Sequence, residues 1–140
     1  MLIVDTGPLV AAADRTDRQH HACLDLLETA SGPLVTTAMV VAEAVYLMTR
    51  ELGPHAEPAF YDAIINGTLT VETLTTADWQ RIRDLVDRYQ DLPLGGTDAS
   101  LIAVAERLGA TRLATLDRAH FSIVRPAHCD AFELTPAPTP

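Results

Sequence analysis

The chain has 140 residues, 48% of them hydrophobic and 21% charged, which is typical of a single globular domain with a hydrophobic core. No apolar run approaches the roughly 18 residues that a membrane-spanning helix requires, which excludes an integral helical membrane protein. The formal net charge is −9 and every basic residue is Arg, which disfavours a protein that coats nucleic acid by charge alone.

Short apolar segments alternate with helix-like patterns along the chain. Strands are predicted over 1–5, 34–36, 69–71, 112–116 and 122–124. Helices are predicted over 9–13, 17–30, about 14 residues after Thr37, 55–66, 76–89, and from Thr97 or Asp98 to Leu108. This alternation predicts a parallel sheet covered by helices on both faces, with sites at the carboxyl ends of the strands. The Pro-rich residues 135–140 are predicted to be a disordered tail, so the predicted domain is 1–134.

Polar residues and glycines set the predicted helix ends. Asp17, Thr37 and Thr76 are the expected N-caps, and Gly53 and Gly109 are expected to end two helices. Within 76–89, the apolar residues have helical spacing and are interpreted as core or dimer contacts; they are Trp79, Ile82, Leu85, Val86 and Tyr89.

Four acidic residues occur beside or within apolar segments, where an isolated carboxylate costs several kcal/mol. Asp5 and Asp117 each end a predicted strand. Glu43 lies inside an apolar helical segment, and Asp98 opens another. No Arg lies within these apolar runs, so we expect the four acids to share a divalent cation. Mg²⁺ and Mn²⁺ prefer oxygen ligands, and such an ion activates water for phosphodiester hydrolysis.

Each acid also has an ordinary structural interpretation. Asp5 or Asp98 would serve as the N-cap of the helix that follows it. Glu43 would pair with a surface Arg, and Asp117 would form a turn. Each interpretation is acceptable for one residue, but all four together are a weaker account than a common site.

Four segments resemble the motifs of PIN-domain ribonucleases, in particular the small VapC-type toxins of bacterial toxin–antitoxin pairs. The segments are LIVDTG (2–7), VVAE (40–43), GGTDASLIA (95–103) and ATLDRAHF (114–121). The match covers residues 1–134 in order and spacing. Each motif is weak by itself, and the ordered set is specific.

The resemblance implies a five-stranded parallel sheet in a three-layer α/β/α sandwich and an endoribonuclease that depends on Mg²⁺ or Mn²⁺. It implies that Asp5, Glu43, Asp98 and Asp117 are the catalytic, metal-holding acids. Thr6 and Thr115 match the supporting polar positions. It further implies an RNA substrate, a homodimer, and inhibition by a cognate antitoxin whose C-terminal segment enters the groove.

Other residues near these motifs are weaker candidates. Arg15, Arg118 and His120 are possible RNA contacts, although a solvated surface position is the more ordinary interpretation of each, and for His120 a solvent-facing loop. Asp91 is interpreted as a turn residue. Gly7 stands where many members of the family carry Ser or Asn, so a side-chain hydrogen bond is expected to be missing there.

Two other functions remain open from the residues. A phosphatase or dehalogenase-like hydrolase also uses a strand-end Asp, but usually has a second acid two residues later, where this chain has Gly7. A non-catalytic PIN-like module that binds RNA or protein would be expected to lack some of the acids. Glycine-rich nucleotide-binding loops are absent from the sequence. Cys23 and Cys129 form no metal-ligand spacing, and a cytoplasmic protein with reduced thiols is expected.

Overall fold

The computed structural model describes residues 1–139 and forms a five-stranded sheet in which every neighbouring pair of strands is parallel. The strand order is β3-β2-β1-β4-β5. The elements in chain order are β1 (Leu2–Val4), α1 (Thr6–Ala13), α2 (His20–Thr29), β2 (Leu34–Thr37), α3 (Ala38–Leu52), α4 (Ala56–Ile65), β3 (Leu69–Glu72), α5 (Thr76–Arg88), α6 (Gly96–Leu108), β4 (Arg112–Ala114), α7 (Arg118–Ile123) and β5 (Glu133–Thr135). The predicted α/β/α sandwich with about five strands is confirmed.

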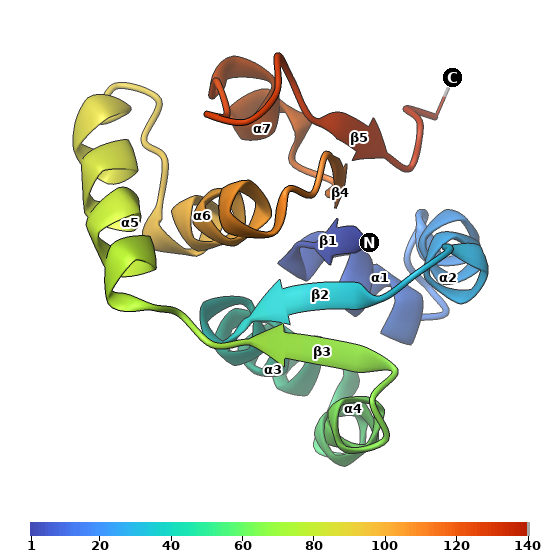
Figure 1. Cartoon of the computed structure of the whole chain (residues 1–140). Helices are drawn as coiled ribbons and strands as arrows, with labels where there is room; N and C mark the ends of the chain where they lie inside the picture. The colour runs from blue at the N-terminus through green and yellow to red at the C-terminus, as the bar shows by residue number, and fades with distance from the viewer. Residues whose placement is uncertain (140) are drawn as a thin grey trace.

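The direction of the strand connections changes at the centre of the sheet. From β1 the chain moves to β2 and then to β3, whereas from β4 it moves to β5 on the opposite side. Since parallel crossovers are right-handed, α1 to α4 cover one face and α5 to α7 cover the other. Consistent with this, α1 packs against α2 and α3, and α5 packs against α6 (Figure 1). The crevice between the carboxyl ends of β1 and β4 is therefore the place where a doubly wound sheet forms a site.

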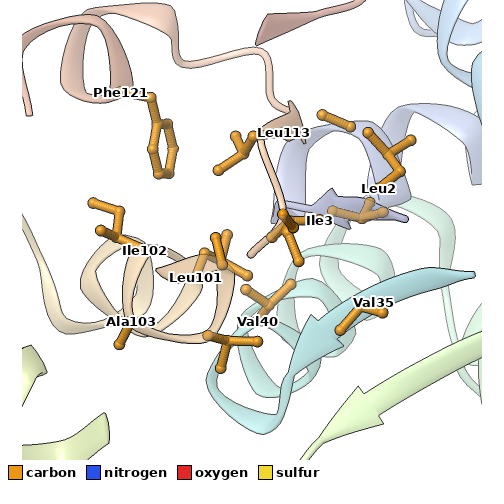
Figure 2. Close-up of a cluster of buried hydrophobic side chains, with 14 of the residues drawn as sticks. Leu2, Ile3, Val35, Val40, Leu101, Ile102, Ala103, Leu113 and Phe121 are labelled. Carbon is orange, nitrogen blue, oxygen red and sulfur yellow. The ribbon is translucent and has the colours of Figure 1, made fainter. Parts of the chain in front are cut away.

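The core covers both faces of the sheet, and on one face it is built on α6, which is buried without interruption from Ala99 to Ala105. Figure 2 shows Phe121 of α7 pointing toward Ile102 of α6 and Leu113 of β4. Leu101 has no exposed surface. The unbroken apolar run in the sequence thus corresponds to a helix that is packed on several sides. An amphipathic surface helix buries only one face and would not have such a run.

The fifth strand is not where the sequence predicted it. Residues 122–124 lie in and directly after α7, and the strand that pairs with β4 is β5, with Thr135 opposite Ala114. β5 is a partly exposed edge strand with only one apolar residue, Leu134, so it lacks the apolar run that marks a buried strand. β5 thus includes Thr135, the first residue of the segment predicted to be a tail. Thr139 accepts a hydrogen bond from Gln19 in the segment predicted to be disordered, and Pro140 lies outside the described residues.

Several helix ends differ from the prediction by one to three residues. Thr75, rather than Thr76, caps α5 in a capping box with Asp78. α2 begins at His20, so Asp17 is not its N-cap. Thr37 caps α3 as predicted, and Gly53 and Gly109 end α3 and α6 with positive φ angles.

The apolar stripe of α5 is only partly core. Ile82 and Leu85 are buried, whereas Trp79 is 51% exposed. Asp78 is buried in the same turn and is paired with Arg107 of α6, so polar contacts rather than Trp79 join this end of α5 to α6. In the described part of the chain, no helix is both long and apolar enough to cross a membrane.

Replacing Leu101 by Ala is expected to lower the free energy of unfolding by about 2–5 kcal/mol, because it removes packed methyl groups and leaves a cavity beneath the sheet. Urea unfolding measures the change. Ile123→Ala is the matched control, since Ile123 is 61% exposed and its truncation is expected to cost no more than about 0.5 kcal/mol. Equal losses in the two variants would contradict the placement of α6 in the core.

Candidate active site

The four acids predicted from the sequence lie at one edge of the sheet. Asp5 directly follows β1, and Asp117 follows β4, the neighbouring strand. Glu43 is in the second turn of α3, and Asp98 is in the first turn of α6. Together they line a hollow of about 450 Å³, whose remaining lining residues are Thr6, Gly7, Leu47 and Leu116.

Asp5 is the most deeply buried of these acids, with 6% of its surface exposed. Its Oδ1 accepts a hydrogen bond from the backbone N–H of Thr6 at 2.7 Å, and its Oδ2 accepts one from the hydroxyl of Thr115 at 2.8 Å. Burial raises the pKa of Asp5 to about 6, and nearby Asp98 and Glu43 add to the increase, while the two hydrogen bonds oppose it. Among the described residues Asp5 has no ion-pair partner.

Two threonine hydroxyls connect the acids. Thr115 donates to Asp5, and its Oγ1 accepts a hydrogen bond from the backbone N–H of Asp117 at 3.0 Å. The hydroxyl of Thr6 donates to Oε2 of Glu43 at 3.1 Å. Both threonines predicted as supporting residues therefore contact the acid cluster directly.

His120 joins the remaining two acids. Its Nδ1 lies 2.8 Å from Oδ2 of Asp98 and 3.3 Å from Oδ2 of Asp117. Burial raises the pKa of Asp98, whereas the hydrogen bond from His120 opposes that rise. The pKa of His120 is raised, chiefly by the same hydrogen bond. His120 is thus on α7 within the cluster, and the interpretation as a solvent-facing loop residue is wrong; three residues after Asp117, one helical turn brings it back to the acids.

The ordinary structural interpretations of the acids hold only in part. Asp5 does cap α1, and it lines the hollow as well. The N-cap of α6 is Gly95, so Asp98 is not a simple cap. Glu43 contacts Thr6 and has no Arg partner among the described residues.

A buried contact beneath the site was not found from the sequence. Thr37 and Ser100 share a hydrogen bond of 2.8 Å between their hydroxyl oxygens, and both side chains are fully buried. This contact joins the start of α3, which carries Glu43, to the start of α6, which carries Asp98. A serine inside the apolar run 99–105 was the available signal, because a buried hydroxyl requires a partner.

The two arginines proposed as RNA contacts have different environments. Arg118 donates through Nη1 to the backbone carbonyls of Leu134 at 3.3 Å and Pro136 at 3.0 Å, so it holds the C-terminal segment. Arg15 is exposed in the turn after α1. Arg15, unlike Arg118, donates no hydrogen bond to a backbone carbonyl of the described residues.

Gly7 has a steric role at the rim of the hollow. A Cβ atom at Gly7 would lie 3.2 Å from Cβ of Leu116, which is closer than most such contacts. The glycine therefore allows Leu116 to approach α1. Leu116 and Leu47 are the two large apolar residues that line the acid hollow.

The donors present fit a hard divalent cation. Carboxylate oxygens are the ligands that Mg²⁺ and Mn²⁺ prefer, and four carboxylates face one hollow. One ligand atom from each of Asp98, Asp117 and His120 lies within 4.8 Å of the others. A metal ion would also compensate the charge of a buried carboxylate such as Asp5, which forms no ion pair with a described residue.

A family model and a known relative both match this chain over most of its length. The model of the PIN domain matches residues 2–125. Ribonuclease VapC26 of Mycobacterium tuberculosis is 31% identical over 135 residues, which is 96% of this chain and 100% of the relative.

Two solved structures share the fold. The Mycobacterium tuberculosis toxin VapC20, described as cleaving the sarcin-ricin loop, matches with a TM-score of 0.75 at 21% identity, covering 81% of this chain and 87% of its own. FitAcB from Neisseria gonorrhoeae matches with a TM-score of 0.54 at 19% identity, covering 86% and 91%.

Asp5→Asn is expected to stabilise the metal-free protein above pH 6. Because the pKa of Asp5 is raised to about 6 in the folded protein, wild-type stability falls as pH rises from about 4 through 6, whereas a neutral Asn avoids this loss. The gain should reach roughly 2–3 kcal/mol at pH 8 and vanish near pH 4. Urea unfolding in EDTA at both pH values tests it.

The exposed Asp91→Asn serves as control and is expected to change stability by less than about 0.5 kcal/mol at either pH. If Asp5→Asn were less stable than wild type at pH 8, the hydrogen bonds from Thr6 and Thr115 would outweigh the cost of burial.

Proposed function

The chain belongs to the PIN-domain family, and on that basis we propose that it is a metal-dependent endoribonuclease that hydrolyses phosphodiester bonds in RNA. The observation that carries the proposal is the convergence of Asp5, Glu43, Asp98 and Asp117 on one hollow without an arginine to neutralise them. The relationship to a protein named as a ribonuclease supports the same activity.

In this proposal the four acids hold Mg²⁺ or Mn²⁺. Bound there, the ion would offset the charge of the scissile phosphate and lower the pKa of an attacking water. The side chain of Asp5 is held in one orientation, because Thr6 and Thr115 each donate a hydrogen bond to one of its carboxylate oxygens. Glu43 and Asp117 are more exposed and are oriented toward the hollow through Thr6 and His120.

Two features of the chain would shape substrate access. Leu47 and Leu116 give the hollow apolar lining beside the acids, and Leu116 is 38% exposed, so it is accessible to a substrate. The exposed Arg15 remains a proposed contact for an RNA phosphate, since an Arg fork matches phosphate oxygens. Arg118 is not proposed for this role, because the carbonyls of Leu134 and Pro136 occupy it.

We also propose that the protein is the toxin of a toxin–antitoxin pair. The support is the relationship to Ribonuclease VapC26 and the fold shared with the toxin VapC20. A cognate antitoxin would then be its protein partner, and cellular RNA its substrate, which places it in the cytoplasm. A homodimer is proposed as well, and the exposed Trp79 on α5 is an apolar residue available for such a contact.

The other two functions have less support. In a phosphatase that uses a strand-end Asp as nucleophile, a second acid would stand at position 7, where Gly7 instead packs close to Leu116. A non-catalytic module would not need all four carboxylates in one hollow. Trapping a phosphorylated Asp5 would favour the first, and binding without cleavage would favour the second.

Purified wild-type protein is expected to cleave RNA with Mg²⁺ or Mn²⁺ and to lose the activity in EDTA. Asp98→Asn should reduce the rate by at least about 100-fold, because it removes a charge that holds the ion. Gel analysis of end-labelled RNA from a broad cellular pool measures both effects.

Asp91→Asn is the matched control, since Asp91 is an exposed acid in the loop before α6 and does not line the hollow. It should cleave at the wild-type rate. Cleavage that persists in EDTA and in Asp98→Asn would refute the proposed mechanism.

Expression of the wild-type chain in a bacterial host is expected to stop growth, and expression of Asp98→Asn is not, because the proposed toxicity comes from RNA cleavage. Growth arrest is measured by colony counts after induction, at equal protein levels confirmed by immunoblot. Growth arrest by Asp98→Asn to the same degree would separate toxicity from the acid cluster.

A further inference from the structure

His120 lies between two of the acids, and we propose that it is a positioning residue that holds the carboxylates of Asp98 and Asp117 in the arrangement that binds the metal. This inference rests on the proposed function and assigns a role to a residue that would otherwise be read as an RNA contact. It depends on three observations: the contacts of Nδ1, the anchoring of α7, and the charges around the imidazole.

The contacts of Nδ1 define the direction of the hydrogen bond. An ionised carboxylate only accepts hydrogen bonds, so Nδ1 carries the proton and donates to Oδ2 of Asp98 at 2.8 Å. The same Nδ1–H is 3.3 Å from Oδ2 of Asp117. One donor thus contacts one oxygen of each acid and leaves the other oxygen of each carboxylate out of this contact.

The helix that carries His120 is held in place by Phe121 in its middle and by Arg118 at its start. Phe121 is buried with 1% exposure and points into the core beside Ile102 and Leu113 (Figure 2). At the start of α7, Arg118 is tied to the carbonyls of Leu134 and Pro136. A helix of six residues has little stability by itself, so these tertiary contacts place His120.

The environment of His120 explains why its loss would matter. Asp98 and Asp117 come from different elements, α6 and the loop after β4, and their like charges repel each other. A donor that contacts both offsets that repulsion and fixes the side-chain orientations. Removing a hydrogen-bond partner of a metal-binding side chain typically lowers metal affinity by roughly 10–100-fold.

The test is Mn²⁺ affinity of the full chain, measured by calorimetry at one pH, for wild type, His120→Ala, His120→Asn and His120→Gln. His120→Ala is expected to bind Mn²⁺ at least about 10-fold more weakly. The amide nitrogen of Asn stands near the position of Nδ1, so His120→Asn should recover most of the affinity. In Gln the amide nitrogen stands near the position of Nε2, so His120→Gln should not.

Circular dichroism checks that each variant is folded, and Asp91→Asn is expected to bind Mn²⁺ like wild type. Unchanged or tighter binding by His120→Ala would overturn the inference, and so would equal recovery by Gln and Asn. A loss of RNA binding at unchanged Mn²⁺ affinity would assign His120 to RNA and also overturn it. If wild type bound no Mn²⁺, the proposed metal-dependent function would fail together with this inference, whereas the other outcomes leave that function intact.

Discussion

The carboxylate of Asp5 is buried at the carboxyl end of β1, where neutral donors from Thr6 and Thr115 hold it and no described residue forms an ion pair with it. Burial without a counter-charge favours the protonated acid, which is why its pKa rises to about 6. The other acids of the cluster increase the deficit of positive charge. A cation that binds only the folded protein would therefore stabilise the fold as well as complete the site.

The parallel sheet places Asp5 and the other acids together. β1 and β4 are neighbours, yet the chain leaves them in opposite directions, so the residues that follow both strands face one crevice. Thr115 uses this proximity, because its hydroxyl contacts Asp5 and the backbone of Asp117 at once. On the other side, the Thr37–Ser100 hydrogen bond sets α3 against α6. The positions of the acids thus depend on buried hydrogen bonds as well as on their places after the strands and on the helices.

Several arginines of the chain join different elements. Arg107 of α6 pairs with Asp78 of α5 and with Glu72 of β3, and Arg81 of α5 pairs with Glu106 of α6, so α6 is joined to α5 and to the end of β3. Arg118 fastens the C-terminal segment to α7. A net charge of −9 repels RNA at long range, so attraction to the site itself would come from a cation held by the acids.

The sequence alone was enough to predict the layered α/β architecture and to single out four acids that the fold brings to one hollow. Both predictions rest on local patterns, namely alternating apolar strands and amphipathic helices, and an acid beside an apolar run. The sequence also located the caps at Thr37, Gly53 and Gly109, since capping depends on one or two residues. β5 was misplaced because a half-exposed edge strand has little apolar signal, and its partner β4 is about 20 residues earlier. The contact of His120 with Asp98 could not be predicted from the sequence either, because it joins α7 to α6 and depends on the packing of Phe121 against the core. Local patterns determine which residues form elements, whereas contacts between distant elements decide which side chains share a site.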